Sequence, residues 1–247
     1  MYQMENEIPF VSAGADKRLK LHEAVTMMMN CCQFQEYQEQ EFCRFLRENH
    51  LAVFLFSIQI DIFRMPEFRE KVTTAVKIYG CKSIYGLRRI TMLDEAGKLC
   101  LIANATGAFF DLEAGKAVKL DTDKIALKFD EAEKMECLPR KIPMPQMQGI
   151  IRPSFTATPS FQDPNGHLTS PVYFAVAADA LPENFIYNRV RVEFKQQITA
   201  GRIILPVCYP LDEKSVVIDL RAGDGKSYAT AEFTSAALTL PEDFPEN

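Results

Sequence analysis

The chain has 247 residues, of which 47% are hydrophobic and 25% are charged, and its formal net charge is -5. This length can bury one large core or two small ones. The acidic balance argues against binding to nucleic acid or to an anionic membrane through overall charge. The apolar runs are too short to cross a bilayer and the first residues lack the pattern of an export signal, so we expect a cytoplasmic protein.

The seven cysteines and three histidines are scattered along the chain. None of the cysteines has the CxxC or Cys/His spacing of a zinc site, and three histidines are too few to favour a histidine-based metal cluster. We therefore expect reduced cysteines that pack as small hydrophobic residues. No metal and no cofactor are expected.

The first half of the chain predicts one long helix followed by strands. Between Lys20 and Glu48, apolar residues recur at three- and four-residue steps, and the pattern thins through the polar run Gln33–Glu41, which predicts a kink or break there. Four segments rich in β-branched and aromatic residues follow, separated by turn residues: Val53–Ile62, Lys71–Tyr79, Ile84–Leu93 and Leu99–Phe110. One helix before an antiparallel run favours a sheet wrapped around that helix.

The second half predicts the same order of elements in a shorter form. The segment Leu138–Gly149 holds three prolines and few strand-forming residues, which is typical of a surface loop or an interdomain linker. After it, the pattern predicts a short helix at Pro171–Leu181 and four strands: Asn188–Gln196, Arg202–Tyr209, Ser215–Arg221 and Ser227–Leu238.

Two segments of the first half can be aligned with two of the second half. Gly97–Phe110 aligns with Gly225–Leu238 at a constant offset of 128 residues, and Ile60–Val72 aligns with Val192–Ile204. Because both alignments occur in the same order, they favour a duplicated domain. We expect an N-terminal domain at residues 1–140 and a C-terminal domain at residues 150–247.

One dense polar cluster interrupts the apolar second half. It is the run Phe161–His167, in which Asp163, Asn165 and His167 precede the predicted short helix. Asp-Pro and Asn-Gly are common turn formers, so an ordinary turn is one interpretation. The other is a catalytic site, in which a carboxylate, an amide and an imidazole meet where a helix N-terminus offers backbone N–H groups to an oxyanion.

These residues resemble a known family, the acyl-ACP thioesterases. The resemblance in the second half consists of the D-x-N-x-H pattern at Asp163, Asn165 and His167, then Tyr173, then Ala177–Pro182. In the first half, Phe56–Pro66, Glu70–Thr73 and Ala108–Leu112 are similar to the N-terminal domain of that family. The resemblance implies an α+β fold of two tandem hotdog domains, each an antiparallel sheet around a central helix.

The resemblance also implies an activity and a partner. It implies hydrolysis of fatty acyl-ACP to free fatty acid and carrier protein, with acyl carrier protein as the partner and water activated by Asp163 and His167. Asn165 would orient water or substrate. The position that holds a catalytic Glu in many relatives is Gln197 in this chain, and an amide has no basic form near neutral pH. Glu193 is the nearest acid in the same predicted strand.

Several alternatives remain open at this point. An acyl-CoA thioesterase and a catalytically impaired acyl-binding hotdog protein have the same fold, and function must be argued from the site. Hotdog hydratases differ by a longer D-x-N-x-x-H spacing. The Met-rich helix, with Met28 and Met29, is expected to line the acyl-chain tunnel. A basic patch for an acidic carrier is expected from Arg152, Arg189, Arg191, Lys195 and Arg202, and a homodimer is compatible with the sequence.

Overall fold

The computed structural model describes residues 1–121 and 128–244. Its first half contains β1 (Tyr2–Glu7), a 3-10 turn at Phe10–Ser12, α1 (Leu21–Gln38), α2 (Gln40–Glu48), β2 (Leu51–Ile62), β3 (Lys71–Lys82), β4 (Tyr85–Asp94), β5 (Leu99–Asp111) and β6 (Lys116–Ala117). Its second half contains β7 (Ile150–Ile151), β8 (Phe155–Thr156), a 3-10 turn at Pro159–Phe161, α3 (Ser170–Asp179), β9 (Arg189–Phe194), β10 (Ile203–Pro210), β11 (Ser215–Arg221) and β12 (Ser227–Thr234).

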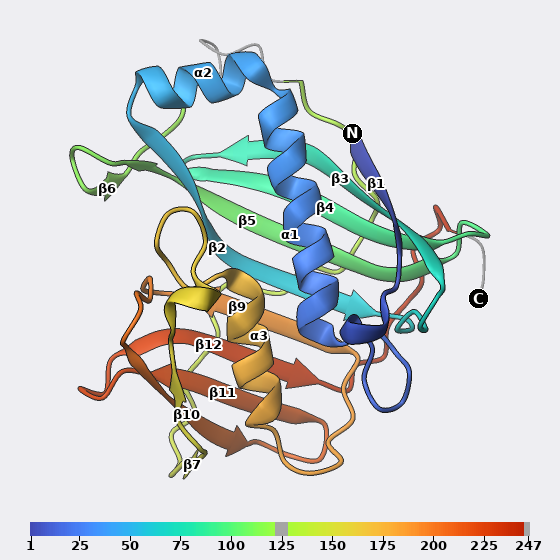
Figure 1. Ribbon diagram of the computed structural model, residues 1–247, viewed down its shortest axis with the longest axis vertical. Coiled ribbons are helices and arrows are strands. Elements are labelled where there is room, and N and C mark those ends of the chain that lie inside the picture. Colours follow the sequence, from blue (N-terminus) through green and yellow to red (C-terminus); the bar gives the residue numbers. More distant parts are fainter. Residues whose placement is uncertain (122–127, 245–247) are drawn as a thin grey trace.

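Within the described residues, all strands belong to one 12-stranded antiparallel sheet with the order β1-β3-β4-β5-β2-β9-β12-β11-β10-β7. In addition, β6 pairs with β5, and β8 pairs with β10. The two halves meet where β2 pairs with β9, from Ser57 opposite Glu193 to Asp61 opposite Arg189. Helices α1 and α3 contact each other and lie on the same face of the sheet, each over its own half (Figure 1). This arrangement confirms the predicted α+β class with a sheet around a helix in each half.

The helical pattern of the first half is explained by one buried face and one interruption. The side chains of Val25 and Met28 are fully buried against the sheet and Cys32 is nearly so. The helix is interrupted at Glu39, whose backbone leaves the helical region and closes α1 before α2 begins. The predicted break in the polar run is therefore confirmed.

The junction between the halves is apolar on the helix side and charged on the other side. Ile58, Ile60 and Val192 are buried beneath the helices, and the alternation of side chains along a strand sends their neighbours to the opposite face. On that face the carboxylate of Asp61 accepts two hydrogen bonds from the guanidinium of Arg189, each 2.7 Å long. Both side chains are buried.

The linker between the halves crosses this charged face. Gln59 donates a hydrogen bond to the carbonyl of Glu136 (2.8 Å) and accepts one from the N–H of Leu138 (2.9 Å). Further along, the N–H of Ile142 donates to the carboxylate of Glu193 at 3.1 Å. Polar residues on the strands thus fix a segment that has no strand or helix of its own.

The structure confirms the predicted repeat and corrects some boundaries. Strands β5 and β12 each begin two residues after the aligned glycines, Gly97 and Gly225, which both have positive φ. Ahead of the predicted helix, Tyr2–Glu7 forms an edge strand whose alternate residues are half-buried on β3, and the sequence pattern did not predict this strand. The strand expected at Asn188–Gln196 ends at Phe194.

In the described part of the chain, no helix is long and apolar enough to cross a membrane.

Candidate active site

Three of the four predicted site residues, Asp163, Asn165 and His167, share one hairpin between the 3-10 turn at Pro159–Phe161 and α3. The N–H of Asp163 donates to the carbonyl of His167 (2.8 Å), and the N–H of Gly166 donates to the carbonyl of Asp163 (2.9 Å). Gly166 has φ of +78°, a conformation that glycine adopts without steric cost. The turn chemistry of the sequence therefore forms a closed loop that holds Asp163, Asn165 and His167 within five residues.

The carboxylate of Asp163 is half-buried and one of its oxygens orders the loop. Its Oδ1 accepts hydrogen bonds from the backbone N–H groups of Asn165 (2.8 Å) and His167 (3.1 Å). In the part of the chain that the structure describes, no group donates a hydrogen bond to Oδ2. One oxygen is thus held by the loop while the other can accept a proton.

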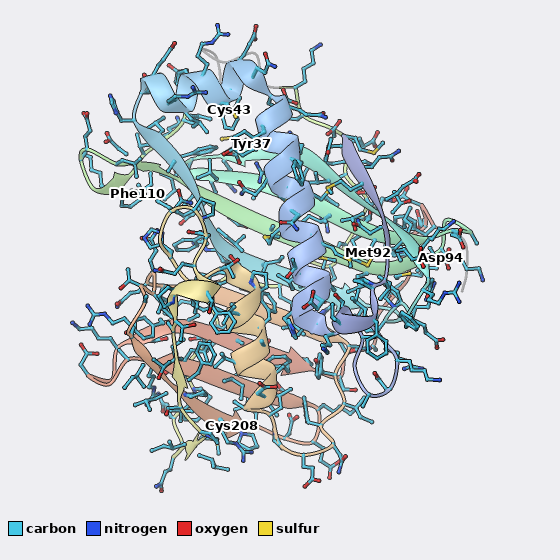
Figure 2. The ribbon with its side chains drawn as sticks, in the orientation of Figure 1. Tyr37, Cys43, Met92, Asp94, Phe110 and Cys208 are labelled. Atoms are coloured by element: carbon cyan, nitrogen blue, oxygen red, sulfur yellow. The ribbon has the colours of Figure 1, made fainter. Side chains whose placement is uncertain are left out.

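His167 brings the hairpin into contact with the other half of the molecule. Its ring packs edge-on against the ring of Phe54 in β2, with centroids 6.4 Å apart. Phe54 also packs against Phe110, with centroids 5.7 Å apart, and Phe110 lies at the end of β5 away from Asp94 (Figure 2). β9 pairs with β2 only from Ser57 onward, so the hairpin lies beside the part of β2 that precedes this pairing.

Tyr173 of α3 lies beneath the hairpin and remains a neutral group. Burial raises the pKa of its phenol well above the ordinary range, and the negative charge of Asp163 adds to the rise. Its ring packs edge-on against Phe194. Tyr173 is therefore a protonated, packed residue beside Asp163.

Gln197 lies near the hairpin but not on a strand. It follows β9 and its side chain is exposed. The next residue, Ile198, accepts a hydrogen bond from the N–H of Leu168 at 2.7 Å, which brings the backbone at Gln197 beside the hairpin. Glu193 lies on the face of the sheet that the linker crosses, where its carboxylate accepts the N–H of Ile142.

The backbone of the hairpin offers few free donors to an oxyanion. The N–H groups of Asp163, Asn165, Gly166 and His167 all bond within the loop. The N–H of Leu168 donates to the carbonyl of Ile198, and the N–H of Thr169 donates to the carbonyl of Phe161. Pro171, in the first turn of α3, has no N–H. The backbone N–H groups of Asp163 and of residues 165–169 are therefore already used, and the exposed side-chain amide of Asn165 is a donor that the hairpin still offers.

An apolar pocket lies between α1 and the sheet of the first half. Its lining includes Met29 and Cys32 of α1, Val53 and Leu55 of β2, and Gly107 and Phe109 of β5. Val53 and Leu55 flank Phe54, the residue that contacts His167, and point to the opposite face of the strand. Met28 is instead a fully buried core residue, so only one of the two methionines named from the sequence lines this pocket.

The basic patch expected from the sequence is only partly available. Arg189 is buried and paired with Asp61. Arg191 is buried and donates to Glu232 at 2.7 Å. Strand alternation places both arginines under the linker, where each forms an ion pair with a carboxylate of the fold. Neither is therefore free to bind an acidic carrier.

The first 127 residues match the model of the acyl-ACP thioesterase N-terminal domain, which is more than half of the chain. The chain belongs to the acyl-ACP thioesterase family. An acyl-ACP thioesterase from Bacteroides thetaiotaomicron is similar in structure, with a TM-score of 0.84 and 18% identity over 94% of this chain and 96% of that chain. A 12:0-ACP thioesterase from Umbellularia californica is also similar in structure, with a TM-score of 0.78 and 13% identity over 98% of this chain and 97% of that chain.

At these identities the structural likeness establishes the fold, and it extends over both halves. The tandem hotdog architecture is therefore confirmed. No curated protein sequence gives a significant match.

The sequence did not reveal Phe54 as a partner of His167. Phe54 belongs to a run of apolar residues in which each side chain has the same character, so the pattern does not show which one faces the hairpin. Only the pairing of β2 with β9 brings these distant segments together.

Proposed function

We propose that this protein hydrolyses fatty acyl-ACP to free fatty acid and carrier protein. Residues 1–140 form the acyl-binding domain in this proposal and residues 150–247 form the catalytic domain. The observation that carries the proposal is the position of the Asp163–His167 hairpin, which packs on Phe54 while the neighbours of Phe54 line an apolar pocket.

The roles of the residues follow from their hydrogen bonds. Asp163 has one oxygen held by the loop, so the other can take a proton from water as it attacks the thioester carbonyl. His167 assists this transfer and can return a proton to the leaving thiolate. The amide of Asn165 donates to the carbonyl oxygen as negative charge develops on it, and Gln197 positions water or substrate.

The acyl chain has a direct route in this arrangement. A thioester beside His167 lies at the free part of the edge of β2, before the pairing with β9 begins at Ser57. From there the chain can pass Phe54 and enter the pocket between α1 and β2. Each buried methylene contributes roughly 0.8 kcal/mol, so the depth of the pocket sets the preferred chain length.

The test is release of free thiol from a series of acyl-ACP substrates of increasing chain length, measured with a thiol reagent. We expect turnover by the wild-type protein and a large loss in Asp163→Asn, which keeps the shape of the side chain but removes the base. Binding of the acyl chain without any thiol release would instead support an acyl-binding protein. Turnover restricted to acyl-CoA would overturn the choice of carrier.

A further inference from the structure

A second cavity lies on the face of the sheet opposite α1 and α3. Its volume is about 210 Å³, and it is enclosed by strands on one side and by residues 138–140 of the linker on the other. Polar side chains cover its floor: Ser57 and Gln59 of β2 and Asn104 and Thr106 of β5. This cavity is separate from the apolar pocket assigned to the acyl chain.

Three positively charged side chains contribute to the lining of the cavity. Lys82, Arg140 and Arg191 all contribute to the wall, and the described lining contains no Asp or Glu. Arg191 is balanced by Glu232. For Lys82 and Arg140, no carboxylate lies within ion-pair distance in residues 1–121 and 128–244. A protein with a net charge of -5 thus keeps two uncompensated positive charges at one cavity.

Arg140 is held in place by aromatic rings. Its guanidinium carbon lies 4.1 Å from the ring centroid of Tyr85 and 4.7 Å from that of Phe56. Stacking of this kind uses the face of the guanidinium and leaves the N–H groups along its edge free to donate. Such a planar, oriented set of donors is suited to a phosphate group.

The cavity and the catalytic hairpin lie along the same strand. Phe54 contacts His167, and Phe56, two residues later in β2, lies under Arg140. Two strand residues span about 7 Å. An anion bound at Arg140 would therefore be near the hairpin but outside the space that the thioester itself needs.

Resting on the proposed function, we propose that this cavity binds the phosphate of a phosphopantetheine arm through Arg140 and Lys82. The arm carries the thioester at one end and the phosphate at the other, so the phosphate must bind at some distance from Asp163. The hydroxyls of Ser57 and Thr106, which lie opposite each other in β2 and β5, supply further donors. The same phosphate occurs on carrier protein and on CoA.

The experiment compares thioesters of one fatty acid with phosphopantetheine, pantetheine, CoA and carrier protein. In Arg140→Ala and Lys82→Ala, we expect kcat/KM for the phosphopantetheine thioester, relative to the pantetheine thioester, to fall about tenfold through loss of a charge-assisted hydrogen bond. Lys141→Ala is the matched control, because Lys141 is exposed and does not line the cavity. It is expected to keep the wild-type ratio.

Other outcomes separate this inference from the proposed function. An unchanged ratio in both variants would overturn the inference while leaving the thioesterase intact. A loss confined to the carrier-protein substrate would also overturn it and would assign the cations to the acidic surface of the carrier. If the wild type has no turnover, calorimetric binding of phosphopantetheine against pantetheine still tests the cavity, and equal affinities would contradict the inference.

Discussion

The two halves of the molecule contain the same hairpin with different chemistry. In the first half, the N–H of Gly14 donates to the carbonyl of Arg18 at 2.8 Å. In the second half, Asp163 and His167 make the same bond at the same length. Each hairpin follows a 3-10 turn and leads directly into a helix, α1 or α3. The duplicated domain therefore preserved this backbone.

The equivalence extends through both loops. Lys17 and Gly166 occupy the same position with φ of +64° and +78°. The N–H groups of Leu19 and Leu168 donate to the carbonyls of Pro66 and Ile198 at 2.8 and 2.7 Å. By these bonds, the residue equivalent to Gln197 in the first half is Met65.

The side chains are where the hairpins differ. Gly14, Asp16 and Arg18 stand in the first half where Asp163, Asn165 and His167 stand in the second half. The turn at Gly14 keeps both main-chain hydrogen bonds, and the carboxylate of Asp16 accepts the N–H of Arg18 at 3.0 Å, as Asp163 accepts that of His167. A carboxylate thus orders the loop in both halves, but only in the second half does it belong to the first residue of the hairpin.

The largest expected effect comes from changing the two hairpins in parallel. Asp163→Asn and His167→Ala should each lower kcat by about 10²–10⁴-fold, because general acid–base catalysis contributes on this scale. Asp16→Asn and Arg18→Ala, at the equivalent positions, should keep kcat within about twofold of the wild-type value. A site confined to the second half requires this contrast between the two pairs of variants. Steady-state thiol release measures both pairs. Equal losses in the two halves would contradict the division of labour.

The second effect concerns the contact between the halves. Asp61→Ala removes the carboxylate that binds the buried Arg189 at the β2–β9 junction, and we expect a loss of about 3–5 kcal/mol in the free energy of unfolding. Glu95→Ala is the control, because its pair with Lys71 is exposed, and it should cost no more than about 1 kcal/mol. Denaturant unfolding followed by circular dichroism gives both values. A small loss for Asp61→Ala would indicate that the junction does not depend on this pair.

The third effect tests the pocket of the first half. Met29→Phe fills part of the pocket and should shift the preferred acyl chain to shorter lengths, by about 1–3 kcal/mol in relative kcat/KM. Met28→Leu is the control, because Met28 is a buried core residue that does not line the pocket. This volume-conserving change should cost less than about 1.5 kcal/mol of stability and should keep the chain-length preference. Competition assays with mixed chain lengths measure the preference. An unchanged preference in Met29→Phe would place the acyl chain elsewhere.

The smallest effect is expected at Gln197. Gln197→Glu adds a second carboxylate beside the hairpin and should change kcat by about tenfold or less, because Asp163 already supplies the base. Since Gln197 is exposed, the new charge has little desolvation cost, and thermal unfolding should be unchanged. Met65→Glu, at the equivalent position of the first half, should leave kcat unchanged. If Gln197→Glu and Gln197→Ala are both without effect, Gln197 lies outside the site.

Local patterns in the sequence were sufficient for the helices, for the strands β2–β5 and β9–β12, for the repeat and for the residues of the hairpin, but not for β1. The helix break at Glu39, the aligned turns at Gly97 and Gly225, and the loop at Asp163–His167 all depend on neighbours within a few residues. Helix periodicity and turn chemistry act over that range, so the sequence carries their signal directly.

The surroundings of the hairpin were decided by tertiary structure alone. The pairing of β2 with β9 determines that Phe54 meets His167, that Arg189 is buried against Asp61, and that the linker crosses the far face. The contacts of Phe54 with His167 and of Asp61 with Arg189 join residues more than one hundred positions apart. A strand shifted by one residue would reverse every side chain, and an apolar run such as Val53–Phe56 has the same character in either register.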